Sequence, residues 1–246
     1  MFGAAGRRAV EERLRGLREE LGVDFCIVNG ENVADGAGIT AKLADKLLAA
    51  GADIVTLGNH TWRREGIASY LARSERVIRP ANYSASAPGR GLAVVGDVAV
   101  INLLGFLFVT PPVGPFEVVD ALVDEARRRA RVVVVDFHAE ATSEKIALAR
   151  WLDGRVTAVI GTHTHVQTND ARILAGGTAA LTDAGMTGPH DSVIGVEAAL
   201  AIERMRTGLP VRFRPAEGGV RIEGALVDAD EDGRATAIEA LRIPWP

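Results

Sequence analysis

Short apolar runs alternate with amphipathic segments along much of the chain, and this alternation constrains the fold more than any other feature. Residues 7–21 carry apolar side chains at three- and four-residue steps, which predicts a helix. The apolar runs at residues 25–28 and 54–57 predict strands, and Thr40 is placed to cap a helix that ends at about Ala50. Strands and helices in alternation indicate a largely parallel sheet covered by helices.

The middle of the chain continues this pattern, and the last part departs from it. Two strand-like runs, at residues 92–95 and 98–103, flank Gly96-Asp97, which is a hairpin signal. Further elements are predicted after them: helices at 117–130 and 143–152, the second capped by Thr142, strands at 132–135 and 156–160, and antiparallel strands between 211 and 243. We find no internal repeat and no clear linker, so we expect residues 1–246 to form one domain.

Composition excludes several other classes of protein. With 48% hydrophobic and 24% charged residues, the 246-residue chain can bury a sizeable core. A net charge of -4 argues against broad binding to nucleic acid, so we expect no stable nucleic-acid complex. The single cysteine, Cys26, rules out an intrachain disulfide and a thiolate metal cluster. No apolar stretch approaches the roughly 20 residues of a membrane helix, and no signal peptide is visible, so we expect a cytoplasmic protein.

Four of the five histidines fall at the ends of predicted strands: His60, His138, His163 and His165. In open α/β sheets, ligands bind outside the carboxyl ends of the strands. A single histidine at such a place is more often structural, but four together predict a site. His163 and His165 are two residues apart, so in an extended chain both imidazoles project to the same side and can reach a shared metal cluster.

Oxygen ligands occur at the same kind of position. Glu31 and Asn32 follow the first predicted strand, and Asn59 precedes His60 after the second. A carboxylate can bridge two cations, an amide oxygen is a neutral ligand, and the imidazole beside it can donate a proton. Imidazole, carboxylate and amide without sulfur suit Mn, Fe or Zn. Two such ions, on the order of 4 Å apart, would stabilise the entering and leaving oxygens of a phosphoryl displacement.

At these residues the chain resembles the YmdB-like bacterial metallophosphoesterases of the calcineurin-like superfamily. The matching stretches are residues 27–32, 56–62, 79–83, 135–145, 161–168 and 182–189. The resemblance covers essentially the whole chain. It implies an α/β fold, a four-layer α-β-β-α sandwich of two mixed sheets flanked by helices. It also implies two divalent or trivalent metal ions (Fe, Mn or Zn) and hydrolysis of phosphodiesters, with 2′,3′-cyclic nucleotides as the expected substrates.

The resemblance also implies a role for each residue of the site. By motif, Glu31 bridges both metals, Asn32 and His165 bind one of them, and Asn59, His138 and His163 bind the other. His60 is the expected proton donor to the leaving oxygen when metal-activated water attacks. The family further suggests homo-oligomers. No membrane partner is expected.

One departure from the family pattern concerns the N-terminus. The family begins with a short strand that ends in Gly-Asp, just before a glycine-containing turn and the first helix. Here Met1 stands where the residue after that aspartate is expected, and Gly3-Ala4-Ala5-Gly6 has the composition of the turn. We therefore expect the functional protein to begin upstream of Met1, and the metal at Asn32 and His165 to bind more weakly than its partner. The same glycines resemble a phosphate-binding loop, but their spacing is not the dinucleotide fingerprint.

Two other functions are consistent with the same residues. The first is a non-catalytic protein that binds a nucleotide or a partner through an incomplete metal site. The second is a mononuclear hydrolase that acts on a carboxylic ester or an amide. Metal content together with hydrolysis of a generic phosphodiester separates these functions from a working phosphodiesterase.

Overall fold

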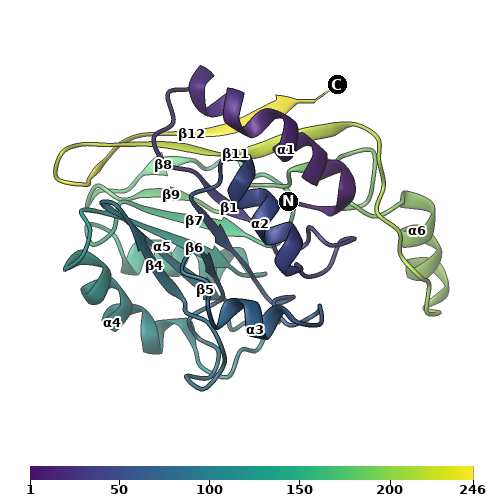
Figure 1. Ribbon diagram of the computed structural model, residues 1–246, viewed down its shortest axis with the longest axis horizontal. Coiled ribbons are helices and arrows are strands. Elements are labelled where there is room, and N and C mark those ends of the chain that lie inside the picture. Colours follow the sequence, from purple (N-terminus) through teal and green to yellow (C-terminus); the bar gives the residue numbers. More distant parts are fainter. Residues whose placement is uncertain (246) are drawn as a thin grey trace.

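A six-stranded mixed sheet forms one half of the fold in the computed structural model, which describes residues 1–245 (Figure 1). Its strand order is β4-β5-β6-β7-β9-β8. The strands are β4 (Leu92–Val95), β5 (Val98–Leu104), β6 (Val132–His138), β7 (Ala158–Thr162), β8 (Arg172–Ile173) and β9 (Ala179–Leu181). The four central strands are parallel, and β4 and β8 are antiparallel at the edges. Strands β4 and β5 pair around Gly96-Asp97, so the predicted hairpin is confirmed.

Two three-stranded sheets make up the second half of the fold. Strands β1 (Ile27–Asn29), β2 (Ile54–Thr56) and β3 (Val77–Ile78) are parallel, whereas β10 (Gly188–Pro189), β11 (Val220–Ala229) and β12 (Ala235–Pro244) are antiparallel. The start of the chain lies between them, because Phe2 forms a parallel bridge with Asn32 and its N–H donates to the carbonyl of Thr187 at 2.9 Å. The predicted sandwich architecture is confirmed, with the layer opposite the large sheet divided into two sheets.

Helices cover both outer faces, which gives four layers (Figure 1). The helices are α1 (Gly3–Glu20), α2 (Ala41–Ala50), α3 (Ile67–Leu71), α4 (Pro115–Arg127), α5 (Thr142–Trp151) and α6 (Ala198–Thr207). Val10 of α1 and Leu47 of α2 pack with Val55 of β2, and α4 and α5 pack on the large sheet through residues such as Val123 and Leu148. Between the sheets lies a smaller apolar layer of Ile54, Ile78, Ala93 and Val100. No helix in the described part of the chain is both long and apolar enough to cross a membrane.

The starts of α1 and α5 differ from the sequence prediction. Residues Gly3 to Gly6, expected as a turn, form the first turn of α1. Gly6 is required there by close packing, because a Cβ at this position would lie 2.3 Å from the carbonyl oxygen of Thr187. Thr142 does not cap α5: the N-cap is Ala141, and it has no side-chain capping bond.

Candidate active site

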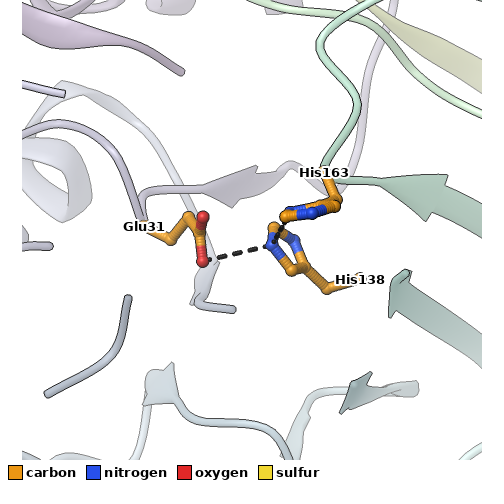
Figure 2. Close-up of side chains that lie close together, drawn as sticks. All are labelled: Glu31, His138 and His163. Atoms are coloured by element: carbon orange, nitrogen blue, oxygen red, sulfur yellow. Dashed lines mark hydrogen bonds and ion pairs between the residues drawn. The ribbon is translucent and has the colours of Figure 1, made fainter. Parts of the chain in front are cut away.

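The polar residues at the strand ends meet at one edge of both halves of the fold. Glu31 and Asn32 follow β1, and Asn59 and His60 follow β2. His138 is the last residue of β6, and His163 and His165 follow β7. Figure 2 shows Glu31 and the imidazoles of His138 and His163, whose nearest ligand atoms all lie within 4.8 Å of one another. Such a group can hold a metal ion.

Four atoms with lone pairs crowd together at the centre of this group. His138 Nε2 lies 3.2 Å from Glu31 Oε2, 3.1 Å from Asn59 Oδ1 and 3.0 Å from His163 Nδ1. Such a cluster of acceptors is repulsive unless a cation or a proton lies between them. The negative charge of Glu31 raises the pKa of His138 even though burial acts to lower it. The raised pKa favours a proton on His138, and a proton on Nε2 would occupy the position that a cation takes.

Glu31 is the only carboxylate in the group, and it is almost fully buried. Burial acts to raise its pKa, but the charge of His138 and the hydrogen bonds from His138 and His60 outweigh burial and hold the pKa well below its usual value. Among the described residues, the buried Glu31 Oε1 accepts no well-formed hydrogen bond: the backbone N–H of His60 donates to Oε2, and His60 Nδ1 is only at ion-pair distance from Oε1, 3.3 Å away. An ionised carboxylate with an unsatisfied buried oxygen destabilises the folded state, and a bound cation would supply the missing contact of that oxygen.

A buried carboxylate fixes the orientation of His138. Asp136 accepts hydrogen bonds from Asn29 at 3.0 Å and from the hydroxyl of Thr162 at 2.7 Å. Because Thr162 donates its proton to Asp136, its oxygen accepts from Nδ1 of His138 at 2.9 Å. This places the second nitrogen, Nε2, toward the acceptor cluster. Outer partners of this kind set the tautomer of metal-binding histidines.

The other two imidazoles are held in the same way. His163 Nε2 lies 2.8 Å from the carboxylate of Glu140, and His165 Nδ1 donates to the carbonyl of Ile194 at 2.9 Å. Burial lowers the pKa of His163 to about 4, helped by the charge of His138. Burial also lowers the pKa of His165. Both rings are therefore neutral at pH 7, and each directs the lone pair of one nitrogen into the site, the form in which histidine binds metals.

A second cluster adjoins the first through Asn32. The amide nitrogen of Asn32 lies 3.1 Å from His165 Nε2, and its amide oxygen lies 2.8 Å from His60 Nδ1. His60 Nδ1 is also 3.3 Å from Glu31 Oε1, so the two clusters share this carboxylate. The arrangement has one donor group with Glu31, Asn59, His138 and His163 and another with Glu31, Asn32 and His165.

Because Gly58 has no side chain, there is space at this position for the carboxylate of Glu31 and the imidazole of His138. A Cβ at this position would lie 2.0 Å from Glu31 Oε2 and 2.4 Å from His138 Nε2. Any side chain here would displace the carboxylate or the imidazole. The glycine in the Gly58-Asn59-His60 sequence is therefore explained by the site and not by a turn.

We expect metal binding to weaken as the pH falls. The cation must displace the proton on His138, whose pKa is raised, whereas Glu31 and His163 are already deprotonated at pH 7. Below the pKa of His138, the apparent affinity for Mn²⁺ should fall roughly tenfold per pH unit, the slope for one displaced proton. Calorimetric titration in buffers of different ionisation enthalpy measures the released proton directly. An affinity that does not change between pH 8 and pH 5 would contradict this prediction.

All seven residues predicted from the sequence lie in these two clusters. The outer partners Asp136, Glu140, Thr162 and Ile194 were not predicted. Asp136 and Glu140 lie two residues to either side of His138, inside a stretch that resembles the family, so a signal for them was present. Ile194 acts through its backbone carbonyl, which side-chain patterns do not reveal.

Helices and sheets in four layers, with imidazoles, a carboxylate and amides gathered at the strand ends, define a metallophosphoesterase. The family model described as YmdB-like protein matches residues 1–241, and the chain belongs to this family. It is 45% identical to a Bacillus subtilis (strain 168) protein named 2′,3′-cyclic-nucleotide 2′-phosphodiesterase, over 99% of this chain and 94% of that protein.

Two solved structures share the fold at high similarity. A protein of Thermus thermophilus, described as hypothetical, has a TM-score of 0.92 and 41% identity, over 100% of this chain and 96% of the other. A protein of Mycoplasma pneumoniae, described as a novel phosphatase, has a TM-score of 0.90 and 34% identity, over 99% and 90%. Along almost its whole length, the chain is thus similar to one protein named a phosphodiesterase and to another described as a phosphatase.

Proposed function

We propose that this protein is a dinuclear metal-dependent phosphodiesterase that hydrolyses 2′,3′-cyclic nucleotides by cleaving the bond to the 2′ oxygen. One observation carries the proposal: the inward nitrogens of His138 and His163 and the buried oxygens of Glu31 share one small space. The substrate and the bond that is cleaved rest on the name of the Bacillus subtilis relative.

The residues present fit two metal ions. Glu31, Asn59, His138 and His163 would hold one, and Asn32 and His165 would hold the other, with Glu31 shared by both. The unsatisfied Glu31 Oε1 supports this assignment, since an ion would complete its contacts. Bound metals would supply Lewis acidity at the phosphoryl oxygens and a lowered pKa for water. The nitrogen and oxygen donors favour Mn, Fe or Zn.

The chain itself supplies a proton donor. His60 is about one-quarter exposed, and its Nδ1 is held by Asn32 at 2.8 Å. That bond fixes the ring, and we infer that the other nitrogen, Nε2, faces the leaving oxygen. In a cyclic phosphodiester the leaving group is a ribose alkoxide, which is strongly basic, so its departure requires a proton. His60 is therefore assigned the role of general acid.

We infer that the whole chain acts as one domain. The donors of each proposed metal come from both halves of the fold, with Glu31 and Asn59 after strands of the small parallel sheet and His138 and His163 from the large sheet. Neither half carries a complete donor group.

The product of hydrolysis tests the proposal. Protein loaded with Mn²⁺ is expected to convert 2′,3′-cyclic AMP to the 3′-monophosphate, which chromatography separates from the 2′-monophosphate. Formation of the 2′-monophosphate would contradict the assigned bond. Strong hydrolysis of phosphate monoesters without any diesterase activity in the same loaded sample would contradict the substrate class. Metal binding without turnover of any ester would favour a binding protein.

The two metal ions are expected to bind with unequal affinity. One donor group has two imidazoles, an amide and the carboxylate of Glu31, whereas the group at Asn32 and His165 has two neutral donors and a share of the same carboxylate. A calorimetric titration with Mn²⁺ should show a tight and a weak step. His163→Ala is expected to remove the tight step and His165→Ala the weak one. Equal affinities, or loss of the same step in both variants, would contradict the assignment.

A further inference from the structure

The loop after β7 holds two of the proposed metal ligands in an unfavourable backbone conformation. His163 has a φ of 106° and His165 a φ of 65°. Residues with a Cβ rarely adopt positive φ, and they keep it only when the surrounding structure holds them there. Something beyond local preference must therefore fix the segment His163-Thr164-His165.

The side chain of Asp183 holds this segment at its middle residue. Thr164 donates to Asp183 Oδ2 twice, from its backbone N–H at 3.1 Å and from its hydroxyl at 2.7 Å. Two bonds from one residue to one oxygen fix both the backbone and the side chain of Thr164. The residues on either side of it then have little freedom to relax toward negative φ.

Asp183 is itself held rigidly. It is fully buried, and Lys145 of α5 pairs with the same Oδ2 at 2.7 Å with almost no exposure to solvent. The other oxygen accepts from the backbone N–H of Gly185 at 2.8 Å. A buried carboxylate with all of these partners has one position available, so Thr164, which bonds to it, is also fixed.

We propose that Asp183 is a positioning residue of the metal centre, which acts through Thr164 to hold His163 and His165 at the spacing that both metals need. This inference rests on the dinuclear site proposed above. Among the described residues, Asp183 bonds to Lys145, Thr164, Thr168 and Gly185 and to no member of the donor clusters. Its effect reaches both, because Thr164 lies between a ligand of one metal and a ligand of the other.

This arrangement has a signature that a purely structural role would not produce. Loss of a single ligand, His163 or His165, weakens mainly its own metal. Release of Thr164 frees both histidines together, so both binding steps weaken in parallel. The metal-free protein, in which Asp183 and Lys145 still pair, keeps its stability. Loss of a residue that holds a metal ligand from outside typically lowers the metal affinity 10–100-fold.

A matched pair of variants tests the proposal. Thr164→Val removes the hydroxyl at constant shape, and Thr164→Ser keeps it. Thr207→Val is the control, since that hydroxyl is exposed and bonds only near the end of α6, to the carbonyl of Glu203 and the backbone N–H of Leu209, far from Thr164 in the chain. We expect Thr164→Val to bind Mn²⁺ roughly 10–100-fold more weakly in both steps. Thr164→Ser and the control should bind as the wild type does, and the melting temperature of all four metal-free proteins should agree.

Two results would overturn the proposal: unchanged binding by Thr164→Val, or equal losses in Thr164→Val and Thr164→Ser. If Thr164→Val does not fold, the double variant Asp183→Asn with Lys145→Met gives the same test, because it removes the buried charge pair together, and both steps should weaken. A wild-type protein that binds no Mn²⁺ contradicts the proposed function itself. A wild type that binds normally beside an unaffected Thr164→Val contradicts only the role of Asp183.

Discussion

Replacing Glu31 with glutamine is expected to leave the protein unable to retain either metal ion, with loss of turnover to the same extent. Glu31 is the one carboxylate in the cluster with His138 and His163, and its free oxygen faces the second cluster. Glutamine keeps the shape but removes the charge that compensates for bringing a cation into a buried site. The metal content after dialysis and the activity in the same sample measure the effect.

A second Glu→Gln replacement provides the control for Glu31. Glu140 is half exposed, and in the described part of the chain its carboxylate pairs with the outer nitrogen of His163 alone. Its replacement should weaken Mn²⁺ binding by roughly 10–100-fold, the usual effect of an outer partner. Excess metal should then restore the metal content and the activity. Glu31→Gln should weaken Mn²⁺ binding by more than Glu140→Gln does, and excess metal should not restore the bound metal or the activity. Retention of normal metal content by Glu31→Gln would show that the carboxylate is not a ligand.

Replacing His60 with alanine should affect chemistry and not metal content. We expect turnover of 2′,3′-cyclic AMP, which has a poor leaving group, to fall by roughly 10²–10⁴-fold, the usual range for general acid catalysis. A diester with a good leaving group, such as bis(p-nitrophenyl) phosphate, needs no proton and should lose much less. The ratio of the two rates isolates proton donation from any effect on binding.

The fifth histidine provides the control for His60. His190 bonds to the carbonyl of Met186 and lies 3.8 Å from Glu223, outside the donor clusters. His190→Gln should leave the ratio of the two rates unchanged. Equal losses on both substrates in His60→Ala would assign His60 to positioning of the site and not to proton transfer.

Strand-end position made the candidate ligands predictable from the sequence. His138, His163 and Glu31 follow apolar runs, and in a parallel sheet the ends of such runs come together. Asp183 and Asp136 could not be predicted in this way, because their roles depend on contacts with residues far away in the chain: Thr164 to Asp183, and Asn29 to Asp136. A buried aspartate near a strand end has the same local pattern whether it binds metal or holds a loop.

Several fold details also depended on tertiary context. Helix α6 was not predicted, and most of its side chains are exposed. Thr142 has the chemistry of a cap, but the cap position lies one residue earlier, at Ala141. The oligomeric state, the cellular compartment, the absence of a nucleic-acid complex and the identity of the metals stay predictions.

The proposed metal centre lies between the two halves of the fold, and this position affects the resistance of the protein to proteolysis. Asp136 of the large sheet accepts a hydrogen bond from Asn29 of the small parallel sheet, and the donor clusters span the same boundary. Ions bound there would join the two halves, and free metal at a hundred times its Kd would add about 2.7 kcal/mol per site to the stability of the folded state. Without metal, the halves can separate more often, and the exposed chain becomes a substrate for proteases. Metal supply would then control the abundance of this enzyme as well as its rate.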